Sequence, residues 1–250
     1  MGRERIKIDL LIHDLKVPLA VIEAGIISLL NRREKYGPLT GQQEKVLRRA
    51  LRNNKVIKTL VNDALELGKS RQGIVNFSNL RLSGLIEDAL VEIFDLTHCN
   101  TSEEIRHCLD LEALKNVLEE KGVLLLIDEV LWGQEVCLDA AKVRQILRNL
   151  LNNALKYRKD RVELVVDKRD GYLIFSVRDD GEGIPSIYHE KIFKCYFQMD
   201  ATESGCVRGH GLGLAGVMVL IEDMGGRLFL ESGEGKGAKF LVEVPLRASR

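Results

Sequence analysis

A histidine near the amino terminus, His13, has the surroundings of a nucleophile. On a helical wheel at about 100° per residue, its side chain is expected to point away from Leu11 and Leu15 and toward solvent. A neutral imidazole has a free ring nitrogen near neutral pH, and the adjacent Asp14 can orient the ring or take its proton. Pro18, one turn further on, removes a backbone hydrogen bond of the helix. Because this destabilises the helix, its presence suggests a functional role. The alternative is a solvated surface histidine.

Two amides and one ammonium lie along a single face of a predicted helix over residues 140–157. Asn149, Asn153 and Lys156 are spaced i, i+4 and i+7. Such a row can hold a hydrated Mg²⁺ ion and phosphate oxygens, because Mg²⁺ keeps several waters and takes few protein ligands. The alternative is a merely polar helix face, although Asn is a poor helix former.

Two glycine-containing segments have the composition of nucleotide-binding loops. Asp179 ends a predicted strand, where it can accept a hydrogen bond from an exocyclic amine, and Gly181 and Gly183 permit a close backbone approach to a flat ring. Residues 209–214 precede a predicted helix and can cradle phosphate with backbone N–H groups. No strand precedes that second segment and no GxxxxGKS/T occurs, which excludes a dinucleotide fingerprint and a P-loop.

The elements that must position these residues begin with a predicted helix over residues 3–34. Its apolar seam has the 3,4 spacing of a coiled coil, at Ile8, Leu11, Leu15, Pro18, Ile22, Gly25 and Leu29. Residues 36–38 end it, and Thr40 with Gln43 forms a capping box for a second helix. That helix repeats the spacing at Leu47, Ala50, Asn54, Ile57, Val61 and Ala64. One hairpin leaves apolar surface exposed, so we expect a homodimeric four-helix bundle; the alternative is docking onto the rest of the chain.

After a predicted linker at residues 73–79, the pattern becomes mixed. Further helices are predicted at residues 83–96, 111–120 and 214–224, and strands at residues 123–128, 162–168, 172–178, 227–231 and 239–244. Asp170-Gly171 is typical of a hairpin turn. Helices with antiparallel strands of this kind favour a two-layer α/β sandwich.

The composition limits the class of protein. The 250 residues carry 37 Lys and Arg against 37 Asp and Glu, which argues against a dedicated nucleic-acid binder. No apolar run reaches the ~18 residues of a spanning helix, so we expect no membrane segment. Five cysteines without a CxxC motif suggest reduced thiols in a cytoplasmic setting. Residues 1–75 hold 15 basic and 8 acidic residues, a net +7, and the remainder holds 22 and 29, a net −7, which favours two domains.

The motifs, in their order and spacing, resemble the bacterial sensor histidine kinase family over nearly the whole chain. The matching segments are residues 13–19 (H-box), 149–157 (N-box), 179–183 (G1 box), 192–197 (F-box), 209–214 (G2 box) and 237–240, where Ala238 replaces the Thr of a Gly-Thr-x-Phe element. The resemblance implies an α + α/β fold: an antiparallel helical hairpin followed by a two-layer α/β sandwich of the GHKL ATPase type. Residues 1–70 would be the dimerisation and phosphotransfer domain, and residues 76–250 the ATP-binding domain.

The resemblance also implies the chemistry. His13 would accept the γ-phosphoryl group of ATP with Asp14 as base, and the group would then pass to an aspartate of a response regulator. Asn153, with Asn149, would lie at Mg²⁺, and Lys156 would reach phosphate. The residues implied to bind ATP are Asn149, Asn153, Lys156, Tyr157, Asp179, Gly181, Gly183, Ile184, Phe193, Phe197, Gly209, Gly211, Leu212, Gly213 and Leu214. Residues 185–211 would form the ATP lid.

Three features depart from the family pattern or stand outside it. Val17 lies where dual-function relatives carry Thr or Asn, so we expect weak phosphatase activity toward the regulator. Gln198 lies where many members place Arg near the γ-phosphate, and Lys191, Lys194 or Arg208 are its candidate substitutes. Only 12 residues precede His13, so we expect either the cytoplasmic core of a longer, membrane-anchored protein or a kinase that receives its signal from a separate sensor.

Two other functions are compatible with the same residues. The chain would be an ATP-binding signalling scaffold if no phosphate were transferred, or an ATPase that drives a conformational cycle, although the latter has no need of the His13 helix. Two His-Cys pairs could in principle hold zinc, at His98-Cys99 and His107-Cys108. The alternative for those pairs is a surface insertion with incidental thiols.

Overall fold

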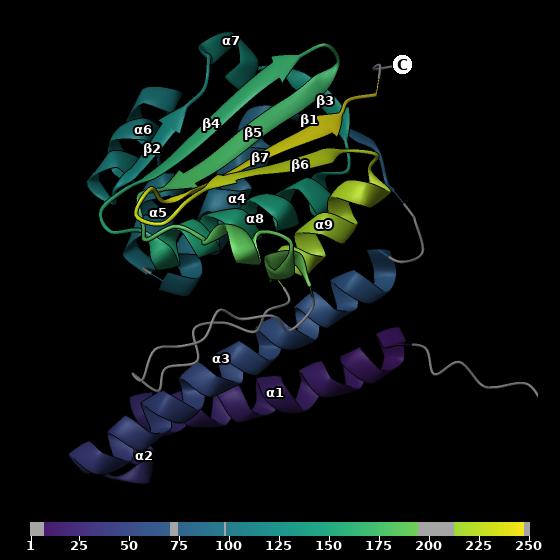
Figure 1. Cartoon of the computed structure of the whole chain (residues 1–250). Helices are drawn as coiled ribbons and strands as arrows, with labels where there is room; N and C mark the ends of the chain where they lie inside the picture. The colour runs from purple at the N-terminus through teal and green to yellow at the C-terminus, as the bar shows by residue number, and fades with distance from the viewer. Residues whose placement is uncertain (1–7, 71–74, 98, 195–212, 248–250) are drawn as a thin grey trace, which may run out of the picture. The chain divides into compact units, whose positions relative to one another are not determined.

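The computed structural model describes residues 8–70, 75–97, 99–194 and 213–247. The chain divides into two compact units, residues 1–72 and 73–250 (Figure 1). Within the described residues, no helix is both long enough and apolar enough to cross a membrane.

The first unit is a helical hairpin of α1 (Ile8–Asn31), the short α2 (Arg33–Tyr36) and α3 (Gly41–Ser70). The predicted capping box forms: Gln43 donates its backbone N–H to Thr40 Oγ1 at 3.2 Å, and Thr40 donates its own to Gln43 Oε1 at 2.9 Å. The first helix was predicted to reach residue 34, which is wrong. Arg32 leaves the helical region at φ −104°, ψ 61°, and separates α1 from α2.

Within the hairpin, α1 meets α3 through Leu19 and Ile26, which are buried. Asn54 of α3 is 4% exposed and donates from Nδ2 to the carbonyl oxygen of Leu19 at 3.0 Å. The predicted seam residues Leu15 and Ile22 are 43% and 49% exposed instead. The apolar stripe of α1 is therefore wider than one seam, and part of it faces α3 while the rest is uncovered within a single hairpin.

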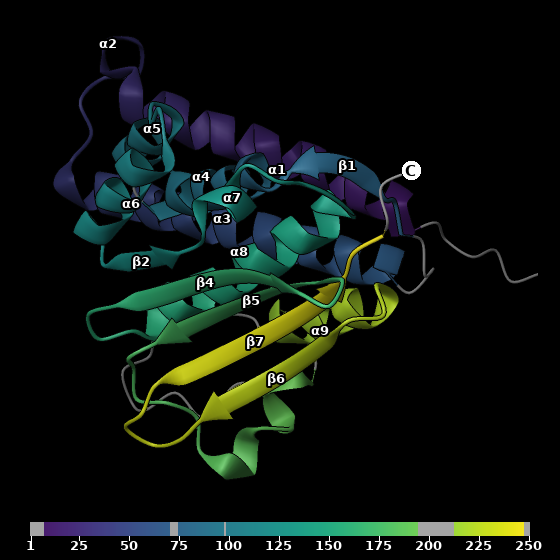
Figure 2. The same cartoon turned by 90° about the horizontal axis from the view of Figure 1, so that it is seen from above.

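The second unit is built on a five-stranded sheet in the order β2-β4-β5-β7-β6 (Figure 2). Its strands are β2 (Val123–Leu126), β4 (Val162–Arg169), β5 (Tyr172–Asp179), β6 (Arg227–Ser232) and β7 (Ala238–Pro245). The expectation of antiparallel strands fails at one place, because β2 runs parallel to β4. The long connection between them, which includes a helix, permits parallel pairing. The predicted turn at Asp170-Gly171 has positive φ at both residues, 49° and 80°.

Helices α4 (Leu82–Thr97), α8 (Ala140–Tyr157) and α9 (Gly213–Asp223) cover one face of this sheet (Figure 1). The core between the layers is closed by fully buried side chains such as Leu90, Ile146, Leu150 and Phe175. α6 (Leu111–Glu120) packs beside β2. Helices over one face of a sheet give the two-layer sandwich that the sequence predicts.

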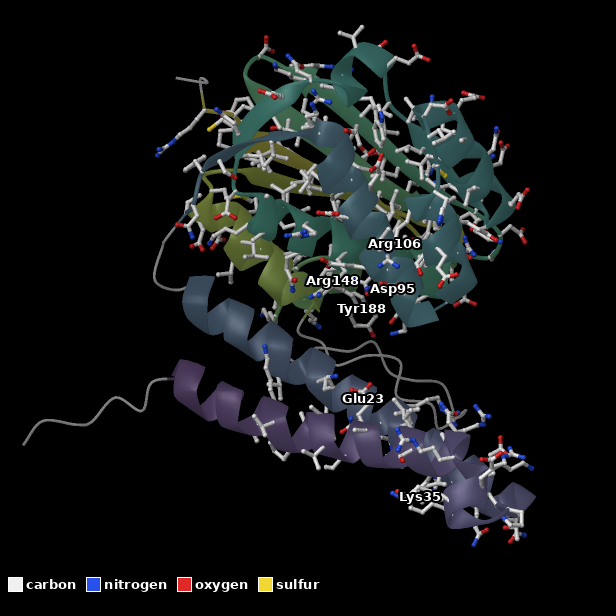
Figure 3. All side chains as sticks on the ribbon, turned by 180° about the vertical axis from the view of Figure 1, so that it is seen from behind. Glu23, Lys35, Asp95, Arg106, Arg148 and Tyr188 are labelled. Atoms are coloured by element: carbon white, nitrogen blue, oxygen red, sulfur yellow. The ribbon has the colours of Figure 1, made fainter. Side chains whose placement is uncertain are left out.

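Six short elements of this unit were not predicted: β1 (Ser78–Arg81), α5 (Cys99–Arg106), α7 (Glu129–Trp132), β3 (Glu135–Leu138) and the 3-10 helices η1 (Ser186–Tyr188) and η2 (Lys191–Phe193). β1 and β3 form a separate two-stranded antiparallel sheet, so the end of the predicted linker is a strand. Elements of four residues are too short to show a periodicity. α5 packs on α4, where Arg106 points toward Asp95 and pairs with it at 2.9 Å (Figure 3).

Candidate functional site

The predicted polar row of α8 is accessible because the opposite face of this helix is buried in the core. Asp139 caps its first turn and accepts the backbone N–H of Lys142 at 3.1 Å. The apolar residues of the helix are buried against the sheet and the neighbouring helices, at Val143, Ile146, Leu147, Leu150, Leu151 and Ala154. Asn149, Asn153 and Lys156 therefore lie on the side that remains accessible.

The structure brings the first of these amides to the start of α9. Asn149 donates from Nδ2 to the carbonyl oxygen of Gly213 at 3.3 Å. This contact joins the predicted amide row to Gly213 and Leu214, the end of the predicted phosphate cradle. At the other end of α8, the ammonium of Lys156 lies 4.6 Å from the ring centroid of Tyr157. The row thus runs from the beginning of α9 to an exposed aromatic ring.

Asp179 ends β5 with 7% of its surface exposed. Its Oδ1 accepts the backbone N–H of Gly181 at 2.9 Å and of Ala238 at 3.4 Å. Burial raises the pKa of this carboxyl, and the two hydrogen bonds oppose the rise. Within the described part of the chain both hydrogen bonds end on Oδ1, which leaves Oδ2 to accept from a ligand.

The two glycines after Asp179 are required by close approach of the protein's own backbone. A Cβ on Gly181 would lie 2.2 Å from the carbonyl oxygen of Tyr157. Gly183 has φ +76°, and a Cβ there would lie 2.0 Å from the carbonyl oxygen of Gly233. The loop is consequently wedged between the end of α8 and the turn that joins β6 to β7.

Two side chains that the sequence analysis missed hold this loop in place. The carboxylate of Asp180 accepts the backbone N–H groups of residues 159–161, at 2.9 to 3.2 Å. Burial acts to raise the pKa of Asp180, but these hydrogen bonds outweigh it and the pKa is lowered. Ser232 Oγ accepts the backbone N–H of Ile184 at 2.8 Å and donates to the carbonyl oxygen of Gly237 at 2.7 Å. The adjacency of Asp180 to Asp179 was a weak signal; nothing in the sequence singles out Ser232.

The chain after the loop is pinned by Ile184 and Phe193. The carbonyl oxygen of Ile184 accepts a hydrogen bond from His189 Nε2 at 2.9 Å. Phe193 packs edge-on against Phe240 of β7, with ring centroids 6.4 Å apart. The remaining predicted lid and cradle residues lie outside the described residues, namely Phe197, Gln198, Arg208, Gly209, Gly211 and Leu212. Lys191 and Lys194 are exposed.

His13 and Asp14 belong to the other unit. Both occupy helical positions on α1, and their side chains fall outside the described part of the structure. Pro18 lies inside the same helix, as predicted, and Val17 is 54% exposed. The candidate nucleophile and the candidate nucleotide residues are thus carried by separate compact units.

The second His-Cys pair, His107-Cys108, makes local hydrogen bonds to the preceding helix α5. His107 bonds through Nδ1 to the carbonyl oxygen of Glu103 at 2.7 Å, and the Cys108 thiol donates to that of Glu104 at 3.4 Å. Both therefore satisfy the last carbonyls of α5. His98 and the Cys99 side chain lie outside the described residues. No cluster of three or more metal-binding side chains occurs among the residues that are described.

Two family models match the chain, in the order of the two units. The His Kinase A (phospho-acceptor) domain matches residues 10–73, and the histidine kinase-, DNA gyrase B- and HSP90-like ATPase matches residues 138–248. The first match contains the α1–α3 hairpin, and the second begins just before α8 and includes the site around Asp179.

Curated relatives share this arrangement over most of the chain. The circadian input-output histidine kinase CikA of Synechococcus elongatus is 31% identical over 240 residues, which are 93% of this chain and 29% of the relative. The aerobic respiration control sensor protein ArcB of Escherichia coli K12 is 29% identical over 236 residues, 93% of this chain and 27% of the relative. The chain thus spans less than a third of the length of these two proteins.

Solved structures show the same fold. Full-length ShkA in complex with AMPPNP has a TM-score of 0.66 at 23% identity, covering 97% of this chain and 46% of the ShkA chain. The Acinetobacter baumannii histidine kinase AdeS has a TM-score of 0.58 at 18% identity, covering 94% of this chain and 98% of the AdeS chain.

Proposed function

Because the chain belongs to the sensor histidine kinase family and carries its catalytic core, we propose that it transfers the γ-phosphoryl group of ATP to His13. The observation that carries this proposal is the presence, in one chain, of a phospho-acceptor helix and a GHKL-type ATP-binding domain with a buried acceptor at Asp179. Residues 1–70 would act as the dimerisation and phosphotransfer domain, and residues 76–250 as the ATP-binding domain.

The nucleotide would be held by residues that the geometry brings together around α8. Asp179 Oδ2 would accept the adenine amine, and Tyr157 would lie against the ring. Asn153, with Asn149, would hold Mg²⁺, whose preference for a few oxygen ligands plus water fits neutral amide oxygens beside a triphosphate. The bound AMPPNP in the similarly folded ShkA supports a nucleotide here. Mg²⁺ would supply charge neutralisation at the phosphates.

The proposed reaction needs positioning more than covalent assistance. A ring nitrogen of His13 attacks the γ-phosphorus, the bond from that phosphorus to the bridging oxygen breaks, and ADP leaves. Asp14 takes the ring proton, or orients the ring, as the new nitrogen–phosphorus bond forms. Lys156 would steady the phosphate oxygens, while the backbone N–H groups at the start of α9, at Gly213 and Leu214, would add positive potential.

We further propose that the hairpin forms a homodimer and passes the phosphoryl group to an aspartate of a response regulator. Exposed apolar residues on both long helices support dimerisation, including Leu15, Val21, Ile22 and Ile57. A sensor domain or a separate sensor protein would control the reaction. The names of the relatives, which include control sensors, support the signalling role.

Val17 supports weak phosphatase activity toward that regulator. Its apolar, exposed side chain offers no group to hold an attacking water. A Val17→Thr variant is expected to remove phosphate from the regulator faster than the wild-type chain does. Loss of regulator phosphate that is already fast with wild type, and no faster with Val17→Thr, would contradict this part of the proposal.

The experiment that tests the proposal incubates the chain with Mg²⁺ and either γ-labelled or α-labelled ATP. We expect acid-labile, alkali-stable label from the γ-position only, and none in the variant His13→Gln. An absence of label with ATP still bound would favour the scaffold alternative. Continuous release of phosphate without labelled protein would favour an ATPase.

A further inference from the structure

A chain of hydrogen bonds runs behind the adenine-binding side of Asp179. The backbone N–H of Ile184 donates to Ser232 Oγ at 2.8 Å, and that hydroxyl donates to the carbonyl oxygen of Gly237 at 2.7 Å. The same peptide group that carries this carbonyl carries the N–H of Ala238, which donates to Asp179 Oδ1 at 3.4 Å. Because a peptide unit is planar, orienting its carbonyl also orients its N–H.

The backbone around this chain of hydrogen bonds is closely packed. Gly237 has φ +73°, and a Cβ there would lie 2.0 Å from the carbonyl oxygen of Asp179. Gly235 donates its N–H to the carbonyl oxygen of Glu182 at 2.6 Å. Apart from Asp179 itself, Ser232 supplies the side chain that hydrogen-bonds across this junction in the described part of the chain.

We infer that Ser232 is a positioning residue that fixes the direction of Asp179 Oδ2 and thereby sets the preference of the site for a purine with a 6-amino group. The inference rests on the proposed nucleotide site and deepens it. Hydrogen bonds in series polarise one another, so the Ser232 hydroxyl strengthens the hold on Oδ1 as well as directing it. Loss of that hydroxyl removes the hydrogen bonds of the Ile184 N–H and the Gly237 carbonyl, and so loosens the hold on the Gly237–Ala238 peptide.

The phosphate end of the site does not depend on this chain of bonds. The amides of α8 and the start of α9 are held by the Asp139 cap and by the bond from Asn149 to Gly213. A change at Ser232 is therefore expected to alter base selection and to leave the affinity for the phosphates unchanged. A merely structural role would instead weaken all nucleotides together.

The test measures the affinity of the full chain for Mg²⁺-ADP and for purine riboside diphosphate, which is ADP without the 6-amino group. Neither ligand has a γ-phosphate, so no turnover intervenes. We expect wild type to prefer ADP, and Ser232→Ala to lower that preference about tenfold through weaker binding of ADP alone. Ser232→Thr keeps the hydroxyl and is expected to restore the preference.

Ser176→Ala is the matched control, because Ser176 is a buried serine of the same sheet that takes no part in this loop junction. Its preference for ADP is expected to equal that of wild type. An unchanged preference in Ser232→Ala, or an equal loss of affinity for both ligands, would overturn the inference. A wild-type chain that binds neither ligand, or an Asp179→Asn variant that keeps its preference, would instead overturn the proposed nucleotide site.

Discussion

The two units of the chain differ in how they bury apolar surface. In the catalytic unit, residues 73–250, the core runs without interruption from α4 through α8 to the sheet. In the hairpin unit, Leu19 and Ile26 are the buried apolar residues among those whose side chains are described. Leu15, Val21 and Ile22 of the same helix remain exposed.

This difference indicates how each unit reaches stability. The catalytic unit closes its own core, so its fold needs no second chain, and the proposed nucleotide site lies within that unit. Among the side chains described, the hairpin leaves part of its apolar stripe uncovered, and in the proposed homodimer its stability would be coupled to a second copy. Phosphate acceptance at His13 would then depend on assembly, and nucleotide binding would not.

The largest effect is expected from Ile22→Asp, which should disrupt association of the hairpin unit. A carboxylate buried without a partner is costly, so the dissociation constant of the dimer is expected to rise about a thousandfold or more. Sedimentation measures the dimer, and ADP titration of the same sample measures the catalytic unit. Equal loss of nucleotide binding would show that the two units are not independent.

Lys142→Met is expected to destabilise the catalytic unit. Lys142 of α8 pairs with Asp223 of α9 at 2.6 Å, and both side chains are largely buried. Removal of one partner leaves a buried charge and is expected to lower the free energy of unfolding of this unit by about 3 kcal/mol. Calorimetry should show one transition shifted and the hairpin transition in place. The double variant with Asp223→Leu is expected to recover much of the loss.

Asp179→Asn is expected to weaken nucleotide binding without unfolding either unit. The amide can present its N–H₂ group where the carboxylate accepted, so a charge-assisted hydrogen bond to the adenine amine is lost. ADP affinity is expected to fall about 30-fold, with the dimer unchanged. Isothermal titration gives the affinity, and thermal unfolding serves as the control for folding. Wild-type affinity in this variant would remove Asp179 from the proposed site.

The smallest expected effect is on the pH dependence of stability, to which the neighbouring carboxyls of Asp179 and Asp180 contribute with opposite sign. The pKa of Asp179 is raised by burial, so its protonation on acidification favours the folded state but costs ADP affinity. The pKa of Asp180 is lowered, so its contribution to stability is present above the ordinary pKa of Asp and is lost as the pH falls through the folded value. ADP affinity should therefore decline at a higher pH than stability does. In Asp180→Asn, stability is expected to lose part of its acid dependence. The decline of ADP affinity is expected to move to lower pH, because the Asp180 charge also raises the pKa of Asp179; a decline that moves to higher pH would contradict this account.

The sequence predicts the parts of this molecule that have a strong local signal. The 3,4 spacing and the Thr40–Gln43 box predict the hairpin, and the polar row at Asn149 predicts the accessible face of α8. Contacts between distant segments leave no such signal. Ser232 meets Ile184 across 48 positions, and β2 joins β4 in parallel through a long connection. The glycines after Asp179 were predicted, but their close approach to the carbonyl oxygens of Tyr157 and Gly233 could not be read from the sequence.

The central claim is that one unit binds the nucleotide and the other accepts the phosphoryl group. It is tested most directly by measuring ADP affinity and γ-phosphate labelling in parallel for the full chain, His13→Gln and Asn153→Ala. We predict wild-type ADP affinity without label for His13→Gln, and loss of label with weakened Mg²⁺-ADP binding but an intact dimer for Asn153→Ala. Label that persists in His13→Gln, or nucleotide binding that is lost with it, would contradict the division of labour between the two units.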